Sequence, residues 1–104
     1  MSYRLGRAFE YRARNKLRAA GYFVVRAAQS KGLVDLAAFR HGRVLFVQCK
    51  RSGMIDREEW NALFDLATEH KAVPVLAEGR GVRWWELKAR REPRKRGQRD
   101  RFEL

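Results

Sequence analysis

The spacing of apolar residues changes from helical to extended near residue 21. In residues 3–20, the apolar side chains fall in one arc of a helix at about 100° per residue, and arginines fall in another arc. The apolar positions are Leu5, Phe9, Ala13, Leu17 and Ala20. This pattern predicts an amphipathic helix that ends at Gly21. Glu10 lies at the seam between the two arcs, so its carboxylate should border the core.

Three β-rich segments follow, and the turn between the second and the third predicts a β-hairpin. The three segments are residues 22–28, 33–39 and 44–50. A turn that is symmetric about residues 41–42 places Asp35 opposite Gln48. Because side chains alternate along a strand, Lys50 shares the face of Gln48. Three polar groups in an apolar strand pair should bind one another or a ligand, since burying them unpaired is costly.

The second half of the chain predicts one more helix and two more strands. Asp56 and Glu59 have the spacing of a capping box, so the helix should begin after Asp56. Apolar residues recur behind them at helical spacing, and residues 73–77 and 82–87 predict the strands. The order α-β-β-β-α-β-β predicts an α/β fold with a central five-stranded mixed sheet flanked by helices.

The charge of the chain indicates an acidic partner. Its 104 residues include 24 Lys and Arg against 12 Asp and Glu, a formal net charge of +12. Nucleic acid is the first candidate and an anionic membrane surface the second. The length excludes a two-domain enzyme, and the 45% hydrophobic content excludes a purely disordered basic chain. Without a membrane-spanning run or a signal-peptide pattern, a cytoplasmic protein without membrane association is expected, or one of the host cytoplasm if a virus encodes it.

Acidic residues are unevenly distributed along the chain. Glu10 and Asp35 are the only two in the first 55 residues. Two structural ion pairs would account for this isolation, and so would an acidic site in a basic surface. Residues 89–104 are rich in basic residues and contain Pro93 and Gly97. We expect a folded domain at residues 1–88, followed by a flexible basic tail that either follows a phosphate backbone or is merely solvated.

Glu10, Asp35, Gln48 and Lys50 form a set that suits a hard divalent cation. Mg²⁺ prefers oxygen ligands and keeps several waters, which a substrate phosphate can displace. Such a metal polarises a phosphodiester and lowers the pKa of a bound water, while a nearby lysine can hold the nucleophile. Carboxylates within a basic surface are typical of a metal-dependent nuclease. A structural salt bridge between Lys50 and Asp35 is the alternative interpretation.

The spacing of Asp35, Gln48 and Lys50 after a helical glutamate resembles the PD-(D/E)XK nuclease superfamily. An ordered set of motifs over residues 4–88 is similar to the archaeal-type Holliday junction resolvases. These motifs are Gly6 with Glu10, residues 21–26, Ser30 with Lys31, and residues 34–37, 47–50 and 73–77. The resemblance implies a restriction-endonuclease-like fold for a nuclease domain at residues 1–88.

The resemblance also implies a role for individual residues. Glu10, Asp35, Gln48 and the backbone carbonyl of Cys49 would bind Mg²⁺ or Mn²⁺, and Lys50 would be the catalytic lysine. Substrate-binding positions are implied at Arg7, Arg26, Ser30, Lys31 and Arg51. Members of this family act as homodimers, in which each active site cuts one strand of a four-way DNA junction.

Gln48 is the main departure, because these resolvases carry Glu at this position. The glutamine is either a native variant, as in Mrr-like restriction endonucleases, or a substitution that disarms the enzyme and spares junction binding. We expect a structure-selective endodeoxyribonuclease that resolves Holliday junctions by paired, metal-dependent hydrolysis. The alternatives are a duplex DNA endonuclease of the Mrr or repair type and a catalytically weakened junction-binding protein.

Overall fold

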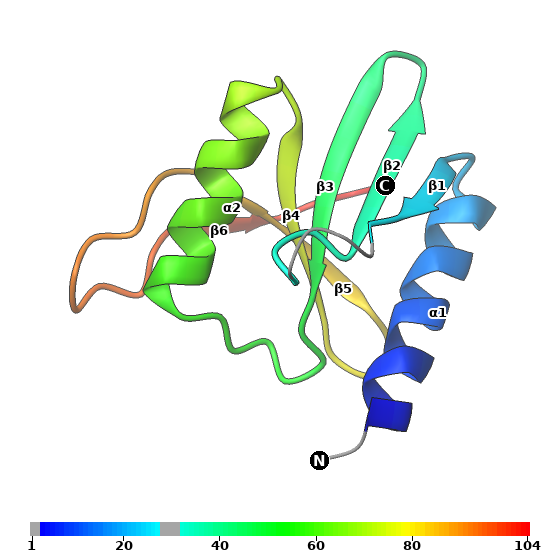
Figure 1. The fold of residues 1–104 in the computed structure, drawn as a ribbon, viewed down its shortest axis with the longest axis horizontal. Coiled ribbons are helices and arrows are strands. Elements are labelled where there is room, and N and C mark those ends of the chain that lie inside the picture. The colour runs from blue at the N-terminus through cyan, green and yellow to red at the C-terminus, as the bar shows by residue number, and fades with distance from the viewer. Residues whose placement is uncertain (1–2, 28–31) are drawn as a thin grey trace.

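In the part of the chain that the structure describes, the fold is an α/β arrangement of two helices and one sheet (Figure 1). The computed structural model describes residues 3–27 and 32–104. The elements are α1 (Tyr3–Ala19), β1 (Phe23–Arg26), β2 (Leu36–Arg40), β3 (Arg43–Cys49), α2 (Arg57–Glu69), β4 (Val73–Glu78), β5 (Arg83–Leu87) and β6 (Arg99–Arg101). Within this part of the chain, neither helix combines the length and the apolar character that a membrane crossing requires.

The six strands form one mixed sheet in the order β1-β2-β3-β4-β5-β6. Only β3 and β4 pair in parallel, since the chain crosses between them through α2; the other neighbours are antiparallel. The predicted class, a mixed sheet flanked by helices, is confirmed. The C-terminal ends of the two central strands lie beside each other, since Cys49 of β3 pairs with Ala77 of β4.

The β2–β3 hairpin has the predicted register. Leu36 pairs with Val47, and the turn at His41 and Gly42 has positive φ values of 49° and 80° at its two central residues. Two left-handed residues produce the turn whose twist matches that of the flanking strands. Just beyond the paired residues, the Asp35 amide donates to the Val47 carbonyl at 2.8 Å. This register brings Asp35 to the open end of the hairpin, beside the end of β3.

The sheet has a separate apolar core on each face. On one face, Val75 and Ala77 pack in the cluster that contains Phe9 and Leu17 of α1. On the other face, Leu76 packs in the cluster that contains residues of α2. This alternation along β4 is the period of two expected for a strand that is buried on both sides. The two helices are thereby held against opposite faces of one rigid sheet.

A sixth strand corrects the expected number of five. Arg99–Arg101 pairs antiparallel with β5, and the amide of the buried Phe102 donates to the Trp84 carbonyl at 2.8 Å. Residues 99–102, expected within a flexible tail, therefore belong to the folded sheet. An edge strand needs only one paired side and commonly carries charged residues, so the Arg-Asp-Arg sequence lacks the apolar alternation that predicts a strand.

Candidate active site

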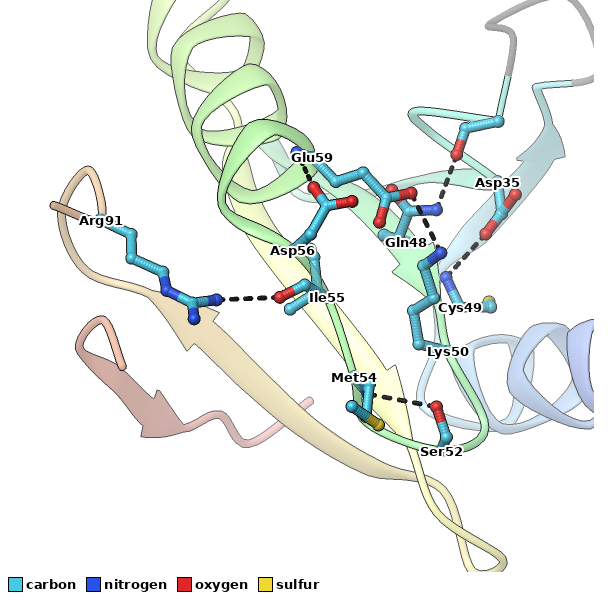
Figure 2. A network of polar contacts seen from close by, with 11 residues as sticks. Asp35, Gln48, Cys49, Lys50, Ser52, Met54, Ile55, Asp56, Glu59 and Arg91 are labelled. Atoms are coloured by element: carbon cyan, nitrogen blue, oxygen red, sulfur yellow. Dashed lines mark hydrogen bonds and ion pairs between the residues drawn. The ribbon is translucent and has the colours of Figure 1, made fainter. Parts of the chain in front are cut away.

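Asp35 lies at the open end of the hairpin, where its carboxylate faces the end of β3. Its Oδ2 accepts a hydrogen bond from the Cys49 amide at 2.7 Å (Figure 2). Burial raises the pKa of Asp35 from 3.8 to about 6. The Cys49 hydrogen bond opposes this rise, Glu10 adds to it, and the charges of Lys50 and Arg26 oppose it. The protein thus holds a carboxylate that a bound cation would stabilise in its ionised form.

Gln48 is buried, with 3% of its surface exposed. Its Nε2 donates to the Gly32 carbonyl at 2.6 Å, whereas its Oε1 is buried without a hydrogen-bond partner in the described parts of the chain. Because a carbonyl can only accept, the Gly32 contact determines which amide atom remains unbonded. A buried oxygen of this kind is costly to leave unpaired and fits a cation ligand. A glutamate at position 48 would place a carboxylate oxygen against the Gly32 carbonyl oxygen, and neither atom could donate a hydrogen bond.

Glu10 is held by an arginine from β1. Its Oε1 accepts from Arg26 Nε at 3.0 Å, and 22% of the Glu10 side chain is exposed. Phe9 beside it is buried, so the position of Glu10 at the border of the core follows from the predicted amphipathic helix. The structure thereby joins the helical carboxylate to an arginine for which the family resemblance implies a phosphate-binding role.

Lys50 pairs with Glu59 rather than with Asp35. The two charged atoms, Lys50 Nζ and Glu59 Oε2, lie 3.0 Å apart (Figure 2). Glu59 comes from the first turn of α2, where its amide donates to the N-cap Asp56 at 2.8 Å, as the capping-box pattern predicted. The sequence pattern indicates only a capping role for Glu59. Nothing in its local sequence indicates that it faces Lys50, because that contact depends on how α2 packs on the sheet.

These side chains line one pocket of about 390 Å³. Its walls are Gly6, Arg7, Glu10, Arg26, Gly32, Asp35, Gln48, Cys49, Lys50 and Glu59. Of the other predicted site residues, Ser30 and Lys31 lie outside the described residues. Arg51 is exposed and is not part of the pocket wall; its carbonyl accepts from the Gly79 amide at 2.9 Å.

The oxygen atoms of this pocket fit a hard divalent cation that takes only some of its ligands from the protein. In residues 3–27 and 32–104, no three His, Cys, Asp or Glu side chains are grouped closely enough to hold a metal ion by themselves. Two carboxylates and the unpartnered Gln48 Oε1 are available instead, and Mg²⁺ typically uses few protein ligands and several waters. Burial raises the pKa of the Cys49 thiol, so this residue has no thiolate to offer.

Comparison with known proteins identifies a family to which this chain is similar. Residues 1–96 match the family described as archaeal Holliday junction resolvase (Hjc). The crossover junction endodeoxyribonuclease Hjc of Methanocaldococcus jannaschii is 38% identical over 79 residues, which cover 72% of this chain and 59% of that protein. The chain therefore spans about three-fifths of the length of this relative.

Proposed function

The chain belongs to the archaeal Holliday junction resolvase family, and we propose that it is a structure-selective endodeoxyribonuclease that cuts four-way DNA junctions in the cytoplasm by metal-dependent hydrolysis. The observation that carries this proposal is the pocket in which Glu10, Asp35, Gln48 and Lys50 meet. The carboxylates of this pocket lie in a protein of net charge +12, which suits a polyanionic substrate.

In this mechanism, a divalent cation would be held by Glu10, Asp35, Gln48 Oε1 and the Cys49 carbonyl, and Mg²⁺ or Mn²⁺ fits these oxygen donors. When bound, the metal polarises the scissile phosphodiester and lowers the pKa of a water molecule. Lys50 holds the attacking water and neutralises charge that develops on the phosphate. The Cys49 amide keeps the Asp35 carboxylate in a single orientation through its 2.7 Å hydrogen bond.

Gln48 is, in this proposal, a native ligand of an active enzyme. Its Nε2 satisfies the Gly32 carbonyl, so the local backbone fits an amide better than a carboxylate. The amide oxygen can coordinate a cation but adds no negative charge, and we therefore expect weaker metal affinity than a glutamate would provide. The disarmed interpretation predicts the opposite result in solution, because junction binding would persist without any cleavage.

Arginines around the pocket are proposed to hold the DNA backbone. Arg7 and Arg26 line the pocket that contains Asp35 and Lys50. The family resemblance adds three further candidates, Ser30, Lys31 and Arg51. A second pocket of about 800 Å³ shares Glu59 with the first. Its walls include Arg91, Arg96 and Arg99 from the basic C-terminal segment. The Arg91 guanidinium already donates to the backbone carbonyls of Ile55 and Lys95. The planar guanidinium groups of the other arginines at the two pockets suit contacts with successive phosphates.

A second copy of the chain is the proposed partner, through the apolar surface of β1 and β2. Phe23 is 70% exposed and pairs in register with the exposed Phe39, with ring centroids 6.4 Å apart; Val25 is exposed beside them. Replacing Phe23 and Phe39 by serine should make the protein monomeric in sedimentation velocity and uncouple the two nicks. Since both rings are exposed in the single chain, the variant should keep the circular dichroism spectrum of the folded protein. Its unfolding temperature should no longer depend on protein concentration. A dimer that persists in this variant would contradict the proposed surface.

The central experiment compares a labelled four-way junction with a linear duplex of the same sequence, with and without Mn²⁺. The proposal predicts paired nicks in the junction and no cutting of the duplex, and chelation of the metal should stop the reaction. Equal cutting of both substrates would indicate a duplex endonuclease instead. Tight junction binding without cleavage at any metal concentration would indicate a binding protein.

A further inference from the structure

Glu59 brings a third carboxylate to the pocket from outside the sequence motif. It lies on α2, whereas the motif residues lie on α1, before β2 and at the end of β3. Its Oε2 is 3.0 Å from Lys50 Nζ, and about a third of each side chain is exposed. Partly exposed ion pairs contribute little to stability. We therefore expect this ion pair to affect the position of the Lys50 ammonium group more than the stability of the fold.

The backbone of Glu59 is firmly anchored. Its amide donates to Asp56 Oδ1 at 2.8 Å, and the next residue, Trp60, is buried and donates through Nε1 to the Ala89 carbonyl at 2.8 Å. Lysine has a long flexible side chain, so an ammonium group without a partner would sample many positions. A carboxylate on an anchored helical turn restricts that sampling, and Glu58 on the same turn is exposed and does not line the pocket.

The charge of the pocket also depends on Glu59. Three basic side chains, those of Arg7, Arg26 and Lys50, line the pocket together with three acidic ones. Removal of Glu59 would leave two carboxylates against three cations, at a site where residue 48 is a neutral amide. A net positive pocket disfavours a divalent cation.

We propose that Glu59 is a positioning residue that holds the Lys50 ammonium at the pocket and supplies the negative charge that Gln48 does not. This inference rests on the proposed nuclease function of the same pocket. It separates two effects of Glu59, a charge effect on the metal and a placement effect on Lys50. A carboxylate introduced at position 48 can replace the first effect but cannot replace the second.

The test uses Glu59→Gln, with Glu58→Gln as the matched control on the same helical turn. Mn²⁺ affinity is measured by isothermal titration calorimetry, and kcat and KM are measured on the four-way junction. Glu59→Gln should weaken Mn²⁺ binding roughly tenfold and lower kcat about 100-fold, with KM for the junction unchanged. Glu58→Gln should match the unmodified protein in all three quantities.

Two further variants separate charge from placement. Adding Gln48→Glu to Glu59→Gln should restore Mn²⁺ affinity while kcat stays low, because Lys50 still lacks its partner. Glu59→Asp retains the charge on a shorter side chain, so it should bind Mn²⁺ normally and cut slowly. This conservative variant also provides a readout if Glu59→Gln does not fold, which circular dichroism will show.

Equal Mn²⁺ affinity and equal kcat in Glu59→Gln and Glu58→Gln would overturn the inference. So would full recovery of kcat by Gln48→Glu, since placement would then not matter. If the unmodified protein does not cut the junction, the proposed function fails, and the positioning of a catalytic Lys50 fails with it. The loss of Mn²⁺ affinity in Glu59→Gln would remain as separate evidence for the charge effect.

Discussion

The buried Glu78 and the half-buried Asp35 have carboxylates in opposite electrostatic environments. Glu78 ends β4 and accepts from Arg83 Nε at 2.7 Å, from Arg83 Nη2 at 3.2 Å and from Trp85 Nε1 at 3.0 Å. The Arg83 hydrogen bonds lower the pKa of Glu78. Asp35 accepts a backbone amide, and burial raises its pKa to about 6.

This difference distinguishes a structural carboxylate from a functional one. Side chains of the fold itself neutralise Glu78, so its ionised form is stable without a ligand. For Asp35, the charges of Lys50 and Arg26 do not offset the effect of burial on its pKa. It lies in a pocket with the buried amide oxygen of Gln48, which has no hydrogen-bond partner among the described residues. A carboxylate in a cleft whose pKa is shifted by burial is a candidate for a functional group. A carboxylate whose pKa is shifted by a structural ion-pair network, as for Glu78, is not. Each carboxylate therefore predicts a different consequence of its removal.

The largest expected effect is on cleavage by Asp35→Asn. Loss of the charged ligand should reduce single-turnover cutting of the junction by more than about 10³-fold, while the basic surface keeps junction affinity within a few-fold. Glu78→Gln should cut at the rate of the unmodified protein. Rapid-quench assays measure the cleavage rate, and gel-shift titration measures the junction affinity. Substantial cleavage by Asp35→Asn would exclude Asp35 as a metal ligand.

Glu78→Gln should have the largest effect on stability. It removes the charged acceptor that Arg83 and Trp85 share, so the free energy of unfolding should fall by about 2 kcal/mol. The control is Glu86→Gln on β5, whose carboxylate pairs with the exposed Lys88 at 3.5 Å. That variant should lose less than about 1 kcal/mol. Urea unfolding measures both, and equal losses would show that the Glu78 contacts have no special weight.

A smaller effect of opposite sign is expected for the stability of Asp35→Asn without metal. Because the folded-state pKa is raised from 3.8 to about 6, the folded protein binds more protons than the unfolded chain between these values. Asp35 therefore costs stability progressively as the pH rises from about 4 to about 6, and the cost persists above that range. Allowing for partial exposure, Asp35→Asn should be more stable at pH 7 by about 1.5 kcal/mol.

The pH dependence provides the check on this last prediction. The difference in unfolding free energy between Asp35→Asn and the unmodified protein should be near zero below pH 4 and should grow to its full size near pH 6. Contributions from other titrating groups are common to both proteins and cancel in the difference. Mn²⁺ should stabilise the unmodified protein at pH 7 and leave Asp35→Asn unaffected. A difference that is constant with pH would show that Asp35 is not desolvated.

Local patterns in the sequence predicted much of the fold and four residues of the pocket wall, namely Glu10, Asp35, Gln48 and Lys50. The family resemblance implied Arg7, Arg26 and Cys49. The turn at His41 and Gly42, together with the alternation along its strands, determined the register and hence the meeting of Asp35 with the end of β3. The capping box predicted where α2 begins. Such signals suffice because a tight turn sets the pairing of its strands and a side-chain period of two sets their faces.

Other features depended on tertiary packing. The Lys50–Glu59 pair exists because the parallel crossover brings the first turn of α2 beside the end of β3, and the Arg26–Glu10 pair because α1 packs on the sheet near β1. The strand at Arg99–Arg101 forms through backbone pairing with β5. Polar side chains and edge strands carry no apolar period in the sequence, so only the assembled sheet decides which charges meet. The sequence alone determined the carboxylates and the hairpin that positions one of them; the tertiary structure decided their charged partners.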